Sequence, residues 1–457
     1  MHSKASVLEF LKPLSKRKLN KVGIYMSEKS KKYRKVHRQV AVGMGLLIGI
    51  LSVAHAQQTL TIAAYPALDE VTKAAIPLWK KKYPQVDIRV MSRPYAEHHS
   101  AMATALSTSV GLPDVMAVEF GHLGRFAESD GLENLGNEPY SIRSRQLRFV
   151  PFAFRQAVNS SGKIVAVPSD IGPGTLLYRV DILKKAGVTE AELTESWDSY
   201  VAAGIKIKAQ TGAYLMANAR DIKDIVIRTD TRSPGSVAYW QPGQGLYINK
   251  SGKIQVDSPR FVRAFELAKK VRELKLDGQI ETWSPEWLGS FKQGTVATQM
   301  SGAWLAAHLN NWIAPETRGQ WRAAQLPEKA WGSWGGNFYA IPKGAKNKTM
   351  AWEFIQMLTL SPELQLSAFK LHDAFPALVA VHDDDFFNQP IPFLGGQQAR
   401  ILWREAASKV SPINVHKLDI VAEEIVNTEM DAVLDKGKPV AAALANARAL
   451  LTQRTAQ

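Results

Sequence analysis

Short apolar runs alternate with amphipathic segments along much of the chain. The first run is LTIAA at residues 60–64; residues 68–83 then carry apolar side chains at helical spacing, and residues 86–90 alternate apolar with polar. An apolar run, an amphipathic helix and a second run joined by short links predict a βαβ unit with parallel strands. The pattern therefore indicates an α/β protein, in which we also expect a strand at residues 214–219.

One segment in the middle of the chain has a different pattern. The apolar run that ends GKIVAV at residues 162–167 is stopped by Pro168, and a second apolar run begins at residue 175. Between them lies the polar and glycine-rich stretch PSDIGPG at residues 168–174. Pro and Gly break regular structure, so we predict irregular backbone here. We interpret this stretch as the point where the chain crosses between two lobes, with a ligand cleft beside it.

The first 56 residues have the pattern of a secretory signal peptide with a long basic front. Residues 1–39 hold 12 Lys and Arg against 2 Asp and Glu, so +10 of the net charge of +15 lies there. The apolar segment at residues 40–53 is shorter than the ~20 residues of a membrane span, and AHA at residues 54–56 fits the small-x-small cleavage rule. We predict cleavage after this segment, with Met26 as an alternative initiator; an uncleaved anchor is the other interpretation.

The rest of the chain has the composition of a globular protein. Hydrophobic residues make up 46% and charged residues 22% of the sequence, and 457 residues favour two domains. Beyond residue 39 the balance is 45 basic to 40 acidic residues, so we expect no nucleic-acid partner. Cys is absent, which excludes disulfides and Cys-based zinc sites. No G-x-G-x-x-G, P-loop, G-x-S-x-G or H-E-x-x-H motif occurs, and we expect no metal and no cofactor. The many carboxylates leave a glycosidase pair open.

A series of motifs resembles the substrate-binding proteins of bacterial sugar-importing ABC transporters, the maltose-binding protein group. The segment at residues 162–168 fits the family's GK-apolar-x-x-P strand, and YRVD at 178–181 fits its Tyr-Asn-x-Asp helix start, with Arg179 where Asn is usual. The other matching segments are LWKKKYPQVDIRV (78–90), GLPDVMAV (111–118), TESWD (194–198), FKQG to MSGAW (291–304), GGNFYAIP (335–342), AWEFIQMLTLSPE (351–363) and FPA (375–377). Each motif is weak alone, but together they follow the family's order from residue 58 to 452.

The resemblance implies an α/β fold of the two-lobe periplasmic-binding-protein type (type II), with a hinge and an interlobe ligand cleft. The first lobe would comprise residues 58–169 and 326–372, and the second residues 170–325 and 373–457. The implied function is a monomeric periplasmic protein that captures a sugar or oligosaccharide and delivers this carbohydrate ligand to the permease subunits of an inner-membrane ABC importer. Two alternatives stay open: a secreted glycan-active hydrolase, and the same fold binding a non-sugar solute.

Aromatic residues are the first candidates for a sugar site, because flat rings cover the C–H face of a sugar. The chain has 12 Trp. Trp304 is preferred because it follows Gly302 in a motif whose tryptophan stacks on sugar in the family, and Trp334 because it begins a predicted strand near the hinge. Core packing is the alternative for each of them. The tryptophans that lie outside strong helical periodicity are Trp240, Trp283, Trp287, Trp304, Trp331 and Trp334.

Polar candidates follow the predicted strand ends, where open α/β sheets bind ligands. They are Tyr65, Glu119, His122, Asp170, Asn218, Arg220, Asp221, Gly336, Asn337, Gly396 and Gln397. The last two belong to FLGGQ, which resembles a family cleft loop. The family's binding glutamate is replaced by Gly172, which predicts a different ligand. The alternatives are that Asp170 caps a turn, that Glu119 is solvated and that Arg220 with Asp221 is a surface pair.

Overall fold

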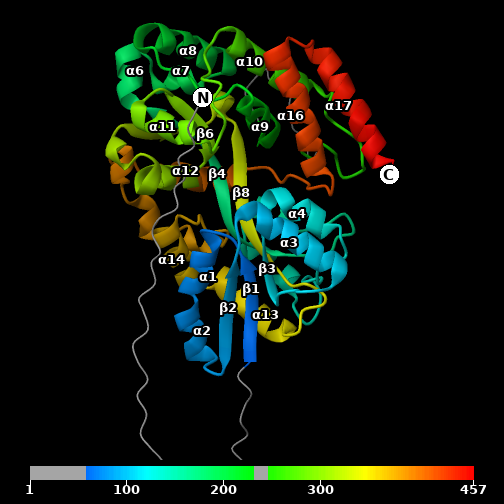
Figure 1. The fold of residues 1–457 in the computed structure, drawn as a ribbon. Coiled ribbons are helices and arrows are strands. Elements are labelled where there is room, and N and C mark those ends of the chain that lie inside the picture. The colour runs from blue at the N-terminus through cyan, green and yellow to red at the C-terminus, as the bar shows by residue number, and fades with distance from the viewer. Residues whose placement is uncertain (1–57, 231–244, 457) are drawn as a thin grey trace, which may run out of the picture. The chain divides into compact units, whose positions relative to one another are not determined.

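A computed structural model describes residues 58–230 and 245–456, and within these ranges eight strands form one sheet (Figure 1). The predicted signal peptide at residues 1–56, with Met26, lies outside the described residues, as does Trp240. The strands are β1 (Gln58–Ala64), β2 (Val86–Ser92), β3 (Val115–Glu119), β4 (Val167–Arg179), β5 (Thr229–Asp230), β6 (Thr298–Gly302), β7 (Trp321–Ala324) and β8 (Trp331–Ala340).

The strand order is β2-β1-β3-β8-β4-β6, with β5 on β8 and β7 on β4. β1 pairs in parallel with both β2 and β3, as the βαβ pattern predicts. β8 is antiparallel to both β3 and β4, and β4 is antiparallel to β6 and β7. β4 and β8 are therefore the two strands that join the two ends of the sheet. β4 also spans the predicted boundary between residues 169 and 170, and the bounds of the two lobes stay a prediction.

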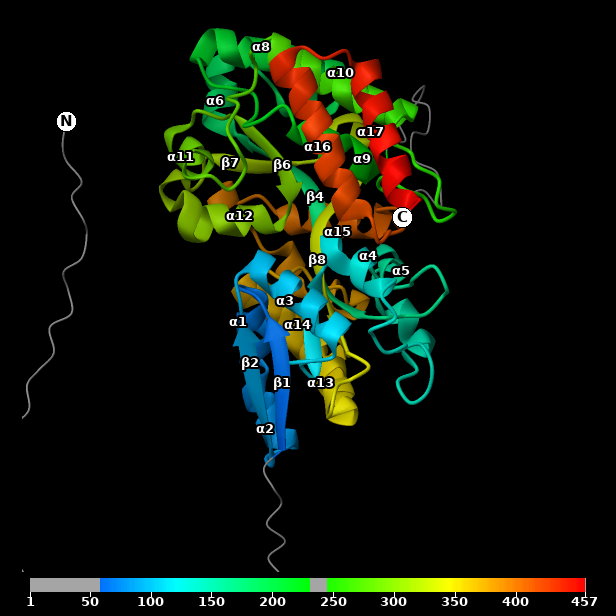
Figure 2. The same ribbon diagram turned by 45° about the vertical axis from the view of Figure 1, so that its right-hand side comes forward.

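Helices pack at both ends of the sheet. Figures 1 and 2 place α1, α2, α3 and α13 beside β1 to β3, and α6, α8, α10 and α11 toward the end that carries β6. The helices are α1 (Leu68–Ala74), α2 (Ile76–Lys82), α3 (Tyr95–Thr108), α4 (Phe120–Ala127), α5 (Pro151–Gln156), α6 (Val180–Ala186), α7 (Glu190–Thr194), α8 (Trp197–Thr211), α9 (Asp221–Arg228), α10 (Pro259–Glu273), α11 (Pro285–Gln293), α12 (Trp304–His308), α13 (Lys348–Leu360), α14 (Pro362–His372), α15 (Ala399–Lys409), α16 (Asp419–Lys436) and α17 (Val440–Thr455).

Short helical turns connect these elements. They are the 3₁₀ turns η1 (Ile142–Arg148), η3 (Pro315–Thr317), η4 (Pro327–Lys329), η5 (Val379–Val381), η6 (Asp385–Asn388) and η7 (Pro392–Leu394), and the π-helical turn η2 (Leu309–Ile313) that continues α12. Of the helices in the described ranges, none combines the length and the apolar character that a membrane crossing requires.

Two predicted elements differ from the structure. The helix expected over residues 68–83 is two helices, α1 and α2, that meet at Ala75. Pro77 in the first turn of α2 has no N–H to donate, so it suits a helix start better than a helix interior. The strand expected at residues 214–219 is reduced to single parallel bridges at Tyr214 and Met216.

The largest departure is the predicted crossing segment. Residues 168–174 are not irregular but lie within the buried strand β4, whose register against β8 shifts twice. Such shifts mark bulges, where proline is tolerated in a strand. A methyl group on Gly172 would lie 1.7 Å from the carbonyl oxygen of Trp334 in β8. The glycine is therefore required by the close approach of the two strands, not by a break in the strand.

Candidate functional site

Three neighbouring strands place polar side chains side by side in the middle of the sheet. In their register, Asn337 of β8 lies opposite Glu119 of β3 on one side and Asp170 of β4 on the other. The Nδ2 group of Asn337 donates hydrogen bonds to both carboxylate oxygens of Asp170, at 2.8 and 3.0 Å. The Tyr65 hydroxyl donates to Oδ1 of Asn337. The structure thus brings four of the predicted site residues into one group.

Asp170 is a buried member of this group, with 7% of its surface exposed. Burial raises the pKa of Asp170 to about 7, and the negative charge of Glu119 acts in the same direction. The hydrogen bonds from Asn337 oppose the shift because they favour the carboxylate. A carboxyl group that titrates near neutral pH can accept a hydrogen bond from a hydroxyl group or donate one to it.

Glu119 ends β3 and caps the N-terminus of α4. Its Oε2 atom accepts hydrogen bonds from the backbone N–H of Gly121 at 2.6 Å and from the Tyr95 hydroxyl at 2.8 Å. Burial raises the pKa of Glu119, and these two hydrogen bonds oppose the rise. Glu119 is thus fixed in place, which differs from the freely solvated side chain considered as its alternative.

Two stacked histidines form a neutral wall beside Glu119. His99 Nε2 accepts the backbone N–H of Glu119 at 3.2 Å, so its Nδ1–H donates to the Tyr95 carbonyl oxygen at 2.8 Å. Burial lowers the pKa of His99 to about 3. The rings of His99 and His122 are parallel within 9° with centroids 3.8 Å apart, and burial lowers the pKa of His122 to about 4. The centroids of the Tyr65 and His99 rings are 5.2 Å apart, so the Tyr65 ring joins this wall to the Asp170 group.

The two preferred tryptophans meet at the backbone of β8, where the indole of Trp304 contacts the main chain of Trp334. Trp304 Nε1 donates to the backbone carbonyl oxygen of Trp334 at 3.0 Å. Methyl groups on Gly302 and Gly174 would lie 2.2 Å from Trp304 Nε1 and 2.3 Å from Trp334 Cζ3, respectively. The indoles can occupy these positions only because β4 and β6 carry glycine there. Trp283 lies parallel to Trp304, with planes at 15° and centroids 5.9 Å apart.

The polar and aromatic groups meet at the adjacent Gly335 and Gly336 of β8. Both glycines have positive φ, 75° and 121°, which other residues rarely adopt. A methyl group on Gly335 would lie 3.5 Å from Glu119 Oε1 and 3.8 Å from Trp304 Nε1. A carboxylate and an indole therefore approach one point. Such a pair can bind a hydroxylated ring, because a carboxylate accepts hydrogen bonds from the hydroxyl groups of the ring and an indole packs against the C–H face of the ring.

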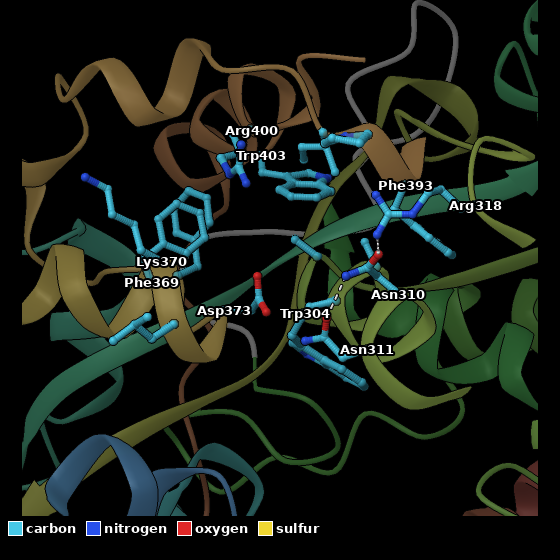
Figure 3. Close-up of a pocket in the computed structure, with 17 residues that line it drawn as sticks. Trp304, Asn310, Asn311, Arg318, Phe369, Lys370, Asp373, Phe393, Arg400 and Trp403 are labelled. Atoms are coloured by element: carbon cyan, nitrogen blue, oxygen red, sulfur yellow. Dashed lines mark hydrogen bonds between the residues drawn. The ribbon is translucent and has the colours of Figure 1, made fainter. Parts of the chain in front are cut away.

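Trp304 also lines a cavity of about 380 Å³ (Figure 3). Figure 3 shows the Asp373 carboxyl group directed into this space between Trp304 and Trp403. Burial raises the pKa of Asp373 to about 6, against the effect of the positive charge of Arg400. The remaining polar lining residues are Asn310, Asn311, Arg318 and Lys370.

Apart from Trp304, none of these cavity residues was among the sequence candidates. One signal was available for Asp373, which lies two residues before the FPA segment at 375–377 that resembles a family motif. No local pattern separates Trp403 from an ordinary core tryptophan, since it lies inside the amphipathic helix α15. Its place in the cavity follows from packing against elements distant in the sequence.

Three other predicted residues make contacts outside the Asp170 group. Arg220 forms an ion pair with Asp431 of α16 at 3.3 Å instead of a surface pair with Asp221. Asn218 Oδ1 accepts the backbone N–H of Arg220 at 3.1 Å, which uses its carbonyl oxygen in a local turn. Asp221 begins α9, accepts a hydrogen bond from Thr282 at 3.4 Å and has a pKa that burial raises to about 7.

The predicted loop residues Gly396 and Gln397 belong to a structural contact with β7. Gln397 Oε1 accepts the backbone N–H of Ala323 at 2.8 Å, and its Nε2 donates to the Ala323 carbonyl oxygen at 2.6 Å. Gly396 has a φ of 85° in the preceding turn. Both ends of the Gln397 amide are thus occupied, and its contacts hold the loop on the sheet. Within residues 58–230 and 245–456, no three His, Asp or Glu side chains form a metal-ligating group.

Residues 74–391 match the family model described as bacterial extracellular solute-binding protein. The chain belongs to this family. The family resemblance inferred from the motifs is therefore confirmed for this solute-binding protein. The family consists of binding proteins that act outside the cytoplasm.

Three curated relatives are 21 to 24% identical to the solute-binding protein over the residues that align. An arabinooligosaccharide-binding protein of Bacillus subtilis (strain 168) is 24% identical over 193 residues, 42% of each chain. A lactose-binding protein of Rhizobium radiobacter is 21% identical over 387 residues, 81% of this chain and 86% of that protein. The chain spans less than half the length of the first two curated relatives it matches, 42% and 48%.

Solved structures show the same fold. An extracellular solute-binding protein of family 1 has a TM-score of 0.74 at 21% identity and covers 85% of this chain and 98% of its own. Maltose-bound T. maritima MalE3 has a TM-score of 0.67 at 21% identity, with 86% and 99% covered. The predicted two-lobe α/β periplasmic-binding-protein fold is confirmed by these likenesses.

Proposed function

We propose that this chain is a periplasmic binding protein that captures a sugar or oligosaccharide and delivers it to an ABC importer. The observation that carries the proposal is that the Glu119 carboxylate and the Trp304 indole both approach the place where a methyl group on Gly335 would lie. We call this place the point above Gly335. A sugar placed there pairs its hydroxyl groups with carboxylate and amide groups and its C–H face with an indole. Leaving one buried polar group unpaired costs about 1–3 kcal/mol, so the site favours guests that satisfy all of its groups.

The chemistry of the relatives supports a sugar over another solute. The named relatives are an arabinooligosaccharide-binding and a lactose-binding protein. A neighbour from B. animalis subsp. lactis was solved in complex with β-1,6-galactobiose, with a TM-score of 0.68 at 22% identity. The polar groups at Gly335 are mainly carboxyl and amide groups, which suit neutral polyols better than anions.

The site draws on both proposed lobes, residues 58–169 with 326–372 and residues 170–325 with 373–457. Tyr65, Glu119 and Asn337 belong to the first lobe, and Asp170 and Trp304 belong to the second. A guest that contacts both lobes binds the closed form better than the open form and shifts the population toward it. The permease subunits then recognise the closed form. Binding breaks no bond, so the protein acts as a carrier and not as an enzyme.

The test is calorimetric titration of the protein purified from the periplasm after expression of the full chain. The ligand panel is arabinose, arabinooligosaccharides, lactose, maltose and β-1,6-galactobiose. A ligand at 100 times its Kd adds about 2.7 kcal/mol to the free energy of unfolding, which a thermal shift also detects.

A matched pair of variants ties binding to the site. Trp304→Ala should weaken binding at least tenfold, because it removes the indole from the point above Gly335. Leu147→Ala, at a side chain that is 90% exposed, should bind like the wild type. Absence of binding to every saccharide contradicts the proposal, and chromatographic detection of cleaved saccharide favours the hydrolase alternative.

A further inference from the structure

A row of aromatic side chains, two of them half-buried and two exposed, leads away from the point above Gly335. We call Trp283, Trp304, His308 and Trp312 the aromatic shelf. Trp283 and Trp312 each expose 51% of their surface, although tryptophan is usually a largely buried residue. Single exposed apolar side chains are common on soluble proteins, whereas a contiguous exposed apolar patch marks a binding site.

The shelf is continuous from one ring to the next. The centroids of Trp304 and His308 are 5.5 Å apart, and those of His308 and Trp312 are 5.7 Å apart. The three residues recur at every fourth position along α12 and its π-helical continuation η2, so they follow one side of this helical segment. Trp312 Nε1 donates to His308 Nδ1 at 2.8 Å, which fixes the outermost ring. Trp304 is the inner end of the row and belongs to the proposed sugar site as well.

The backbone at Trp283 is strained in a way that keeps its indole exposed. Its φ is 68°, a conformation that costs a non-glycine residue of the order of 1 kcal/mol or more. This conformation places the Trp283 ring parallel to Trp304. The neighbouring Trp287 is the core residue of this pair, with 1% exposed, so Trp283 is not needed to fill the interior. Strain without burial is typical of a functional surface.

We propose that the aromatic shelf binds the outer residues of a saccharide whose first residues occupy the point above Gly335. The substrate class is then an oligosaccharide longer than a disaccharide. This inference rests on the proposed function. The occupant is a sugar chain because the shelf continues the sugar site through Trp304, and the spacing of its rings is similar to the length of one sugar residue. The shelf supplies stacking surface with few polar atoms, so it senses chain length more than hydroxyl pattern.

The test compares chain lengths in two homologous series, arabinobiose to arabinotetraose and maltose to maltotetraose. Calorimetric titration is run on the wild type, Trp312→Ala, Trp312→Phe and the control Leu147→Ala. We expect the affinity of the wild type to rise from disaccharide to tetrasaccharide. Trp312→Ala should lose about tenfold in affinity for the tetrasaccharide, because the outer sugar residues no longer bury the exposed half of the Trp312 indole. Its affinity for the disaccharide should stay unchanged. Trp312→Phe should retain most of the rise in affinity from disaccharide to tetrasaccharide.

The outcomes separate this inference from the proposed function. If disaccharides bind and Trp312→Ala leaves the dependence on chain length unchanged, the shelf is not a saccharide surface, and the inference is overturned while the proposed function stands. If only monosaccharides or disaccharides bind, the inference is likewise overturned. If no saccharide in either series or in the wider panel binds, both proposals fail together. Urea unfolding of each variant shows whether a lost affinity reflects a lost fold.

Discussion

The buried carboxyl group of Asp170 provides a quantitative test of the electrostatics of the site. Burial raises the pKa of Asp170 from its ordinary value of 3.8 to about 7 in the folded protein. In Asp170→Asn the side chain keeps its shape but cannot ionise. Asn337 Nδ2 loses one of its two acceptor atoms, which lowers stability by about 1 kcal/mol at every pH. Any further change in stability that depends on pH must come from the carboxyl group.

The sign of the pH dependence follows from proton binding. Below pH 3.8 both the folded and the unfolded wild type bind the Asp170 proton, so ionisation has no effect. As the pH rises through 3.8, the unfolded state releases the proton while the folded state keeps it until about pH 7. The wild type therefore loses stability across this interval, by up to about 4 kcal/mol at 1.36 kcal/mol per pH unit. The free energy of unfolding of Asp170→Asn, relative to the wild type, should rise by the same amount.

The measurement is urea unfolding of both proteins, without ligand, at intervals between pH 4 and pH 8. Asp198→Asn is the control for loss of one negative charge, because the side chain of Asp198 is 84% exposed. The quantity of interest is the difference between each variant and the wild type as a function of pH. A difference for Asp170→Asn that changes by less than about 1 kcal/mol over this range would refute the conclusion that burial opposes ionisation of Asp170.

Two further substitutions test the packing of β4 and the role of the FLGGQ loop. Gly172→Ala should lower the free energy of unfolding by about 2 kcal/mol or more, because its methyl group would lie 1.7 Å from the Trp334 carbonyl oxygen. Gly289→Ala in α11, where the nearest atom would be 3.7 Å away, should be neutral or stabilising in the same urea titration, and equal effects would contradict this account. Gln397→Ala should lower the free energy of unfolding by about 1–2 kcal/mol, because the hydrogen bonds of Gln397 to β7 are lost, and it should leave the saccharide affinity unchanged. A loss of affinity without a loss of stability would instead place Gln397 in the saccharide site.

Local sequence patterns predicted the elements whose stability depends on near neighbours. The parallel pairing of β1 with β2 followed from the apolar runs at residues 60–64 and 86–90. The TESWD segment at residues 194–198 contains Ser196, which forms a capping box with Ser199 at the N-terminus of α8. The capping hydrogen bonds of α8 lie within four residues of each other, and β1 and β2 are consecutive strands joined by a single helical connection.

The sequence alone also determined the family, because many weak motifs occur in one order along the chain. Only the tertiary structure decided that residues 168–174 are a bulged strand, since glycine and proline are acceptable there only when a partner strand fits against them. It also decided which candidates meet. Glu119 and Trp304 approach one point through the register of four strands, β3, β8, β4 and β6, because Trp304 begins the helix that follows β6. Gln397, by contrast, is held by the backbone of β7. Side chains far apart in sequence converge through long-range strand pairing, which leaves no local pattern to read.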